Sequence, residues 1–224
     1  MTATTLHPFW HSIKTIITGF VIGMAACMPI VFLFEIGEKG NVRTPPSLLI
    51  NTVLNLTVLI YGQVVLKSTI LNARVSTLHF IKLFSLFVVF FLAMDVLSIF
   101  VKLPSFSNSI FVHEFKQNPT HFFISVVVIA PILEELIFRG VILDYLLKHK
   151  SEKTSILYSG LIFGLMHFSP DQVFFAFFAG ILLGYVYVKS RNIVVPILFH
   201  AINNALSFVY IHYGHSSFLD FFKN

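Results

Sequence analysis

The sequence predicts an all-α fold: a polytopic membrane bundle of about seven transmembrane helices, in which the last four form the functional core. The first observation is composition, because 56% of the 224 residues are hydrophobic and 11% are charged, whereas soluble domains carry about 25% charged residues. The 27 Phe residues alone exceed the 25 charged side chains. The second observation is a series of apolar stretches close to the roughly 20 residues that cross a bilayer. Both exclude an ordinary soluble globular protein.

Seven apolar stretches follow one another along the chain, and the first four are long. The last three are shorter or more polar. The first is expected to be an uncleaved helix, since its apolar run continues beyond Cys27. We predict one integral membrane domain, residues 1–224, with three accessory helices in 1–119 and the core helices in 120–213. The stretches cover residues 15–34, 48–66, 83–101, 122–147, 154–168, 173–188 and 193–211.

The basic residues are scattered between the apolar stretches, so the formal charge of +5 does not indicate nucleic-acid binding. Short cytoplasmic loops retain Lys and Arg, and seven crossings divide these residues nine to five. The larger group is Lys14, Lys67, Arg74, Lys82, Lys148, Lys150, Lys153, Lys189 and Arg191. The smaller group is Lys39, Arg43, Lys102, Lys116 and Lys223. The amino terminus is therefore predicted to be cytoplasmic and the carboxy terminus to lie outside.

The fourth stretch contains Glu134, Glu135 and Arg139, and ionisable groups inside a membrane require a functional or pairing reason. On a helix, Glu135 and Arg139 share a face at the i, i+4 spacing and can form a buried ion pair. Glu134 points about 100° away and has no local cation. A poorly solvated, unpaired carboxylate of this kind can act as a general base. The alternative is a Glu-Glu-Arg cluster that only clamps helices together.

Three further polar residues are expected at a similar depth in the bundle. Counted at about 1.5 Å per residue from the cytoplasmic helix ends, Glu134 and His167 lie roughly 21 Å deep, Asn204 near 20 Å and His200 near 14 Å. His200 and Asn204 share a helix face. Each alone has a structural interpretation, as a satisfied bundle histidine or a bridging asparagine. Together they predict one buried polar site.

Other intramembrane polar or small residues are interpreted as structural. Asp95, Asn51 and Asn55 are expected to bridge helices, and Asp144 is expected to form a surface pair with Lys148. Two glycine pairs favour close helix packing. They are Gly160 with Gly164 and Gly180 with Gly184.

The motifs Glu134-Glu135-x-x-x-Arg139, Phe163-x-x-x-His167 and His200-x-x-x-Asn204 occur in this order on successive helices. The set, with the flanking Phe138, Gly140 and Ala201, resembles the CPBP intramembrane proteases. That family includes the type II CAAX prenyl endopeptidases and the Abi proteins linked to bacteriocin processing or self-immunity. The resemblance covers roughly residues 120–207.

The resemblance implies a glutamic intramembrane endopeptidase. Glu134 would activate water, and His167 would hold or polarise that water. His200 and Asn204 would stabilise the oxyanion, with Glu135 and Arg139 in support. No cofactor is the favoured expectation; the alternative is zinc held by Glu134, His167 and His200, since a chain with the single Cys27 has no Cys-rich metal site.

The expected partners are the lipid bilayer and a membrane-associated peptide or a lipidated protein as substrate, with no nucleic acid. The expected location is the bacterial inner (plasma) membrane. Two alternatives remain open. One is a non-catalytic membrane immunity or binding protein of the Abi type. The other is a proton-coupled transporter, which the absence of an evident inverted repeat disfavours.

Overall fold

The computed structural model describes residues 3–36, 47–104, 115–116, 118–167 and 169–213, and these residues form helices and connections without a named β-strand. The all-α prediction is confirmed for this part of the chain. Residues 105–114 and 117 lie outside the described part of the chain, as do Lys39, Arg43 and Lys223. The elements are α1 (Ala3–Ile36), α2 (Ser47–Leu66), α3 (Thr77–Phe100), α5 (Pro119–Phe123), η1 (Ile124–Ile129), α6 (Ala130–Glu135), η2 (Leu136–Leu143), α7 (Asp144–Leu147), α8 (Glu152–Leu165), α9 (Pro170–Ser190) and α10 (Val194–Tyr213).

Each of the seven predicted stretches falls on a helical rod, and α5, η1, α6, η2 and α7 follow one another as a single rod. Within the described residues, two helices are long and apolar enough to cross a bilayer, α3 and α9. Residues 52–66 and 194–210 form shorter apolar helices. The count of seven crossings therefore stays a prediction. The fifth rod ends at Leu165, earlier than the predicted residue 168, because the chain turns at Met166 before Pro170 starts the next helix.

Several helices begin where the sequence supplies a capping side chain. Ser76 accepts a hydrogen bond from the backbone of His79 at the start of α3, and Ser151 does the same for Thr154 at the start of α8. Asn118 caps α5, with Pro119 in its first turn. These side chains satisfy backbone N–H groups that a helix start leaves unpaired.

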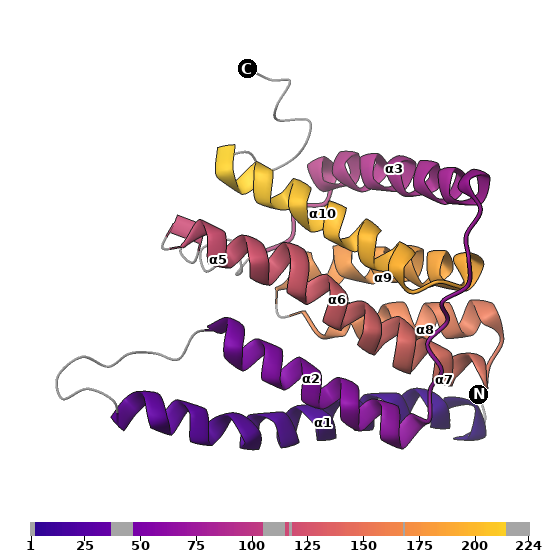
Figure 1. Cartoon of the computed structure of the whole chain (residues 1–224). Coiled ribbons are helices and arrows are strands. Elements are labelled where there is room, and N and C mark those ends of the chain that lie inside the picture. The colour runs from indigo at the N-terminus through magenta and orange to yellow at the C-terminus, as the bar shows by residue number, and fades with distance from the viewer. Residues whose placement is uncertain (1–2, 37–46, 105–114, 117, 168, 214–224) are drawn as a thin grey trace.

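The helices are arranged in layers, with α1 and α2 on one side and α3 on the opposite side (Figure 1). The rod α5–α7, with α8, α9 and α10, lies between them. One apolar core joins α1 and α2 to η2 and α8, through side chains such as Ile16, Val58, Val141 and Phe163. A second core joins α3 to α9 and α10 around Phe199. The middle layer thus holds the elements that carry the motifs.

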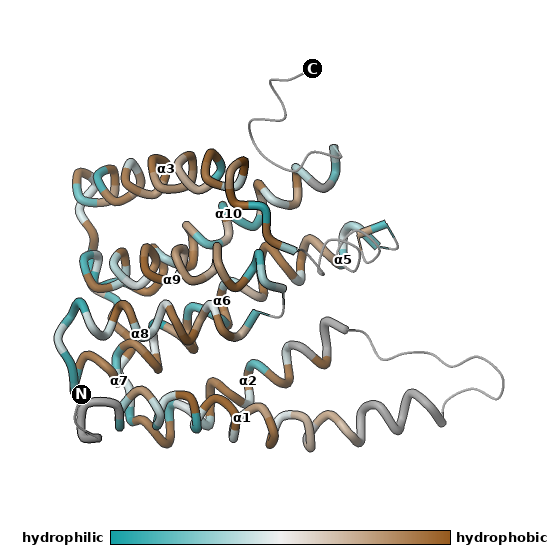
Figure 2. Tube along the Cα trace, turned by 180° about the vertical axis from the view of Figure 1, so that it is seen from behind, coloured by the Kyte–Doolittle hydropathy of each residue, from teal (hydrophilic) through white to brown (hydrophobic). Residues whose placement is uncertain are grey.

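Helix α3 presents most of its surface outward. Only 11% of its most apolar window is buried, and its tube is hydrophobic along much of its length (Figure 2). Leu83 and Phe87 are its buried residues. An apolar helix that is exposed in this way requires a hydrocarbon environment.

Helices α8 and α9 pack closely because glycines face each other where they cross. A Cβ added to Gly160 would lie 2.9 Å from the backbone nitrogen of Ile181, and one added to Gly180 would lie 2.9 Å from the Cα of Gly160. At Gly164 an added Cβ would meet the carbonyl oxygen of Val173 at 2.9 Å. The predicted close packing is confirmed for these three glycines, whereas Gly184 has ordinary space around it.

Residues 67–76 form a strap that runs across one end of the bundle from α2 to α3 (Figure 1). The strap exchanges backbone hydrogen bonds with the turn after α9, from Ala73 to Arg191 (2.7 Å) and from Ile193 to Leu71 (2.9 Å). Thr69 donates its N–H to the Asp144 carboxylate (2.8 Å), which also pairs with Lys148 (2.8 Å). The predicted Asp144–Lys148 pair is present, but the prediction that it is a surface pair is wrong for Asp144. The carboxylate is largely covered because it holds the strap.

Candidate active site

The rod that carries Glu134 and Glu135 changes from α to π geometry on both sides of them. The short segment α6 lies between η1 and η2, and the N–H of Ala130 bonds to the carbonyl of Ser125, five residues earlier. In this register the carbonyl of Val126 faces position 131, and Pro131 has no N–H to donate. The Val126 carbonyl therefore has no backbone donor at position 131, and Asn204 on α10 donates its side-chain N–H to it instead, at 2.9 Å. Such π segments often occur at functional sites.

Glu135 and Arg139 form the buried ion pair that their spacing predicts. The Nε of Arg139 lies 2.9 Å from Oε2 of Glu135, and both side chains are fully buried. The contact is an ion pair between two oppositely charged side chains. Arg139 donates a hydrogen bond to the carbonyl of Gly180 (3.2 Å) on α9. The pair thus joins the rod to the glycine crossing of α8 and α9.

The other oxygen of Glu135 binds His200 from α10. The Nδ1 atom of His200 lies 2.9 Å from Oε1 of Glu135. A carboxylate only accepts hydrogen bonds, so this contact assigns the proton to Nδ1 and leaves Nε2 as the free edge of the ring. That edge faces Glu134, with 3.9 Å between Nε2 and Oε2 of Glu134. The distance is longer than a hydrogen bond but within the range of an ion pair if the ring is protonated.

Glu134 differs from its neighbour in exposure. Its side chain is 27% exposed, whereas that of Glu135 is fully buried. Within the described residues, no salt bridge joins Glu134 to an arginine, as its position on the helix predicts. The structure therefore places a partly accessible carboxylate next to a histidine whose other nitrogen is already held.

Phe163 on α8 joins the two histidines and the arginine. The guanidinium carbon of Arg139 lies 4.6 Å from the centre of the Phe163 ring, which is a cation–π geometry. The same ring forms T-shaped contacts with His167, at 5.0 Å between ring centres, and with His200, at 5.8 Å. The motif included Phe163, but its helical spacing could not show that this ring also packs against Arg139 on η2 and His200 on α10.

His167 lies just beyond the end of α8, because that helix ends at Leu165. Its Nδ1 atom lies 2.9 Å from the carbonyl oxygen of Phe163, so Nε2 is the free nitrogen. Within the described residues, no hydrogen bond joins His167 to Glu134 or His200. The four predicted catalytic side chains are thus placed differently: Glu134 and His200 are in contact, while His167 and Asn204 reach the same region through Phe163 and Val126.

Asn204 shares a helix face with His200, as predicted, and both side chains reach the rod that carries Glu134. Its oxygen accepts a hydrogen bond from Asn203 at 3.3 Å. One N–H is used by Val126, and a carboxamide carries two. Among the described residues, the second N–H has no acceptor, so it is the donor that remains for a ligand.

A zinc site needs three converging donors. Among the described residues, no three His, Cys, Asp or Glu side chains are grouped so that they could hold a metal ion. The alternative ligand set of Glu134, His167 and His200 is therefore not assembled in this structure, and we derive no step through a metal.

The apolar helices and the buried carboxylate–imidazole array first define the class, a helical membrane protein with ionisable groups enclosed between its helices. Residues 116–206 then match the family described as type II CAAX prenyl endopeptidase Rce1-like. This match confirms the resemblance that the motifs indicate, and every motif residue lies within the matched segment. That segment of the chain is similar to this family.

One curated relative is the "Putative membrane peptidase YdiL" of Bacillus subtilis (strain 168), which is 33% identical over 81 residues. The alignment covers 34% of this chain and 32% of the relative, so it spans about a third of that protein's length. No solved structure matches the chain.

Proposed function

We propose that the protein is an intramembrane endopeptidase that hydrolyses a peptide bond of a membrane-associated or lipidated peptide or protein. The observation that carries this proposal is the array Arg139–Glu135–His200, which turns the free edge of a buried imidazole toward the partly exposed carboxylate of Glu134. The Rce1-like match of the same segment supports it.

In the proposed reaction the Glu134 carboxylate takes a proton from a water molecule, and the oxygen of that water attacks the scissile carbonyl carbon. His167 holds or polarises the water through its free Nε2. The carbonyl oxygen becomes an oxyanion as the tetrahedral intermediate forms. When the C–N bond breaks, the protonated Glu134 returns its proton to the leaving amine. No covalent acyl-enzyme forms.

The oxyanion is stabilised by Nε2–H of His200 and by the second N–H of Asn204. Because Nδ1 of His200 already donates to Glu135, Nε2 can donate only when the ring is an imidazolium. Glu135 supplies the counter-charge for that cation, and Arg139 pairs with Glu135 on its other side. Glu135 and Arg139 are therefore positioning residues, which act through His200.

We further propose that the protein resides in the bacterial inner (plasma) membrane and meets its substrate there. The exposed apolar face of α3 supports a bilayer environment. The substrate class, peptide or lipidated protein, follows the family description of the matched segment.

The test is cleavage of a panel of lipidated and unlipidated peptides by the purified protein. Loss of one general acid–base group lowers turnover by about 10²–10⁴-fold, so we expect a loss of this size for Glu134→Gln and a clear loss for His167→Ala. Glu152→Gln is the matched control, because Glu152 is an exposed carboxylate that pairs with Lys189. Full turnover by Glu134→Gln would instead support a binding or immunity protein. Loss of turnover in a strong chelator would support the zinc alternative.

A further inference from the structure

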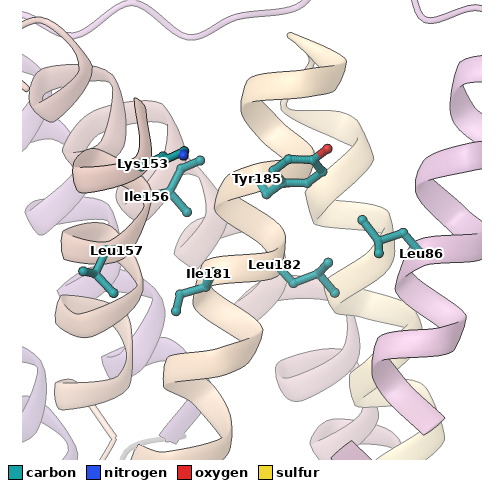
Figure 3. Close-up of a pocket in the computed structure, with 7 residues that line it drawn as sticks. All are labelled: Leu86, Lys153, Ile156, Leu157, Ile181, Leu182 and Tyr185. Atoms are coloured by element: carbon teal, nitrogen blue, oxygen red, sulfur yellow. The ribbon is translucent and has the colours of Figure 1, made fainter. Parts of the chain in front are cut away.

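A groove of about 620 Å³ opens between α3, α8 and α9, a size typical of ligand clefts. None of the proposed catalytic or positioning residues lines it. Figure 3 shows α9 in the middle, with α8 and α3 on either side. The apolar and aromatic side chains that line the groove are Leu86, Ile156, Leu157, Ile181, Leu182 and Tyr185.

The groove opens toward the hydrocarbon side of the bundle. Leu157 is 46% exposed, Leu86 is 40% exposed and Tyr185 is 37% exposed. These side chains belong to three different helices, one of which, α3, is mostly uncovered. In a bilayer, a concave apolar surface of this kind is filled by hydrocarbon chains.

One end of the groove is positively charged. Lys153, at the start of α8, is the one charged side chain among those that line it. Lys82 lies one turn before Leu86 on α3 and therefore shares its helix face. The start of α3 lies at the same end of the bundle as Lys189, because His79 contacts the carbonyl of Lys189 at 3.0 Å. Lys82 on α3 and Lys153 on α8 thus lie at the same end of the bundle.

These two lysines are not neutralised by the protein. Within the described residues, neither Lys82 nor Lys153 has a salt bridge, and both are exposed. Lys189 is different, because it pairs with Glu152 at 2.6 Å and lies 5.5 Å from the centre of the Tyr185 ring. The Glu152–Lys189 pair adds no net charge, so among the described residues Lys82 and Lys153 supply the net positive charge at this end of the groove.

We propose that the groove binds one anionic glycerophospholipid. An acyl chain lies along Leu86, Leu157 and Leu182, and the headgroup phosphate is held by Lys82 and Lys153. The Tyr185 hydroxyl supplies a hydrogen-bond donor at the boundary between chain and headgroup. The site requires an amphiphile with an apolar tail and a negative head, and a bilayer supplies this molecule at high local concentration.

The test is titration of the purified full-length protein in detergent with phosphatidylglycerol or phosphatidylcholine, with bound lipids counted by native mass spectrometry. A lysine near an anionic headgroup contributes about fivefold in affinity. We therefore expect one tight site with a roughly 25-fold preference for phosphatidylglycerol. The double variant Lys82→Gln/Lys153→Gln should bind both lipids equally.

Two further variants separate the site from general charge effects. Lys14→Gln/Lys102→Gln removes two exposed lysines elsewhere and should keep the preference. Leu157→Trp places a larger side chain at an exposed position of the groove and should weaken binding of both lipids. Equal binding of the two lipids by the wild type, an equal loss in the Lys14/Lys102 variant, or unchanged lipid binding by Leu157→Trp would each overturn the proposal. The readout is lipid binding, so it is independent of peptide cleavage.

Discussion

At the scale of single residues, the central feature is the division of labour between two adjacent glutamates. Glu135 is fully buried and interacts with Arg139 and His200, whereas Glu134 is partly exposed and faces the free edge of that histidine. One residue of difference in sequence turns a side chain about 100° around a helix. The same rod can therefore carry a structural carboxylate and a reactive one in succession.

We expect removal of the buried negative charge of Glu135 to lower the free energy of unfolding far more than removal of the whole Glu135–Arg139 pair. Breaking a buried ion pair costs about 3–5 kcal/mol, because the remaining charge is left uncompensated. We therefore expect Glu135→Gln to lower the free energy of unfolding by about this amount. The measurement is denaturant or thermal unfolding of the protein in detergent.

The double variant Glu135→Leu/Arg139→Met is the control, since replacing both partners by apolar residues is often neutral or stabilising. It should recover stability but not peptide cleavage, because His200 then lacks its positioning carboxylate. Recovery of cleavage together with stability would show that Glu135 and Arg139 only fasten helices together.

At the scale of elements, the site depends on two local departures from regular packing, the π segments around Glu134 and the glycine crossing of α8 and α9. The order of the motifs and the burial of Glu135 with Arg139 could be predicted from helical spacing. The π segments could not be predicted, because the sequence around Pro131 also fits a kinked α-helix. The hydrogen bond from Asn204 to Val126 could not be predicted either. The Val126 carbonyl lacks a backbone donor only in the π register, and that register is not visible in the sequence.

Substitution of Pro131 by alanine restores a backbone N–H in the rod. That N–H can pair with Val126 or Val127, so it competes with Asn204 and favours regular α geometry. We expect Pro131→Ala to fold with equal or greater stability, since proline is unfavourable in a helix interior by about 3 kcal/mol. Peptide cleavage should fall at least tenfold, because the face that carries Glu134 rotates relative to α10.

Pro196→Ala is the matched control for this experiment. Pro196 lies in the first turn of α10, where the missing N–H has no helical acceptor. Cleavage and stability should both stay close to wild type. Unchanged cleavage by Pro131→Ala would show that the π register does not position the site.

The glycine crossing supports a second prediction at this scale. Gly160→Ala places a Cβ 2.9 Å from the backbone nitrogen of Ile181, which cannot move without shifting α9. Overpacking of this kind costs about 1–3 kcal/mol. Gly184→Ala is the control on the partner helix, because its Cβ would meet the nearest atom at 3.5 Å, an ordinary contact. Thermal unfolding should show a loss for the first variant and no loss for the second.

At the scale of the whole molecule, the strap brings the starts and ends of several helices to one end of the bundle. Lys148 donates to the carbonyl of Lys67 (2.9 Å), and Lys189 pairs with Glu152 at the start of α8. The backbone bond from Ala73 to Arg191 adds the turn after α9 to this end. The larger group of basic residues predicted from the sequence therefore includes residues that are neighbours in space, such as Lys67 and Lys148, although they are far apart in the chain.

This concentration of positive charge argues for one orientation in the bilayer, with the strap on the cytoplasmic side. The test uses a Cys27→Ser background, so that no other thiol is present, and adds Lys150→Cys near the strap or Lys102→Cys beyond the end of α3. A membrane-impermeant thiol reagent applied to intact cells should label the Lys102→Cys protein at once, and the Lys150→Cys protein only after permeabilisation. The reverse pattern would invert the orientation. Labelling of both variants in intact cells would contradict an odd number of membrane crossings between residues 102 and 150.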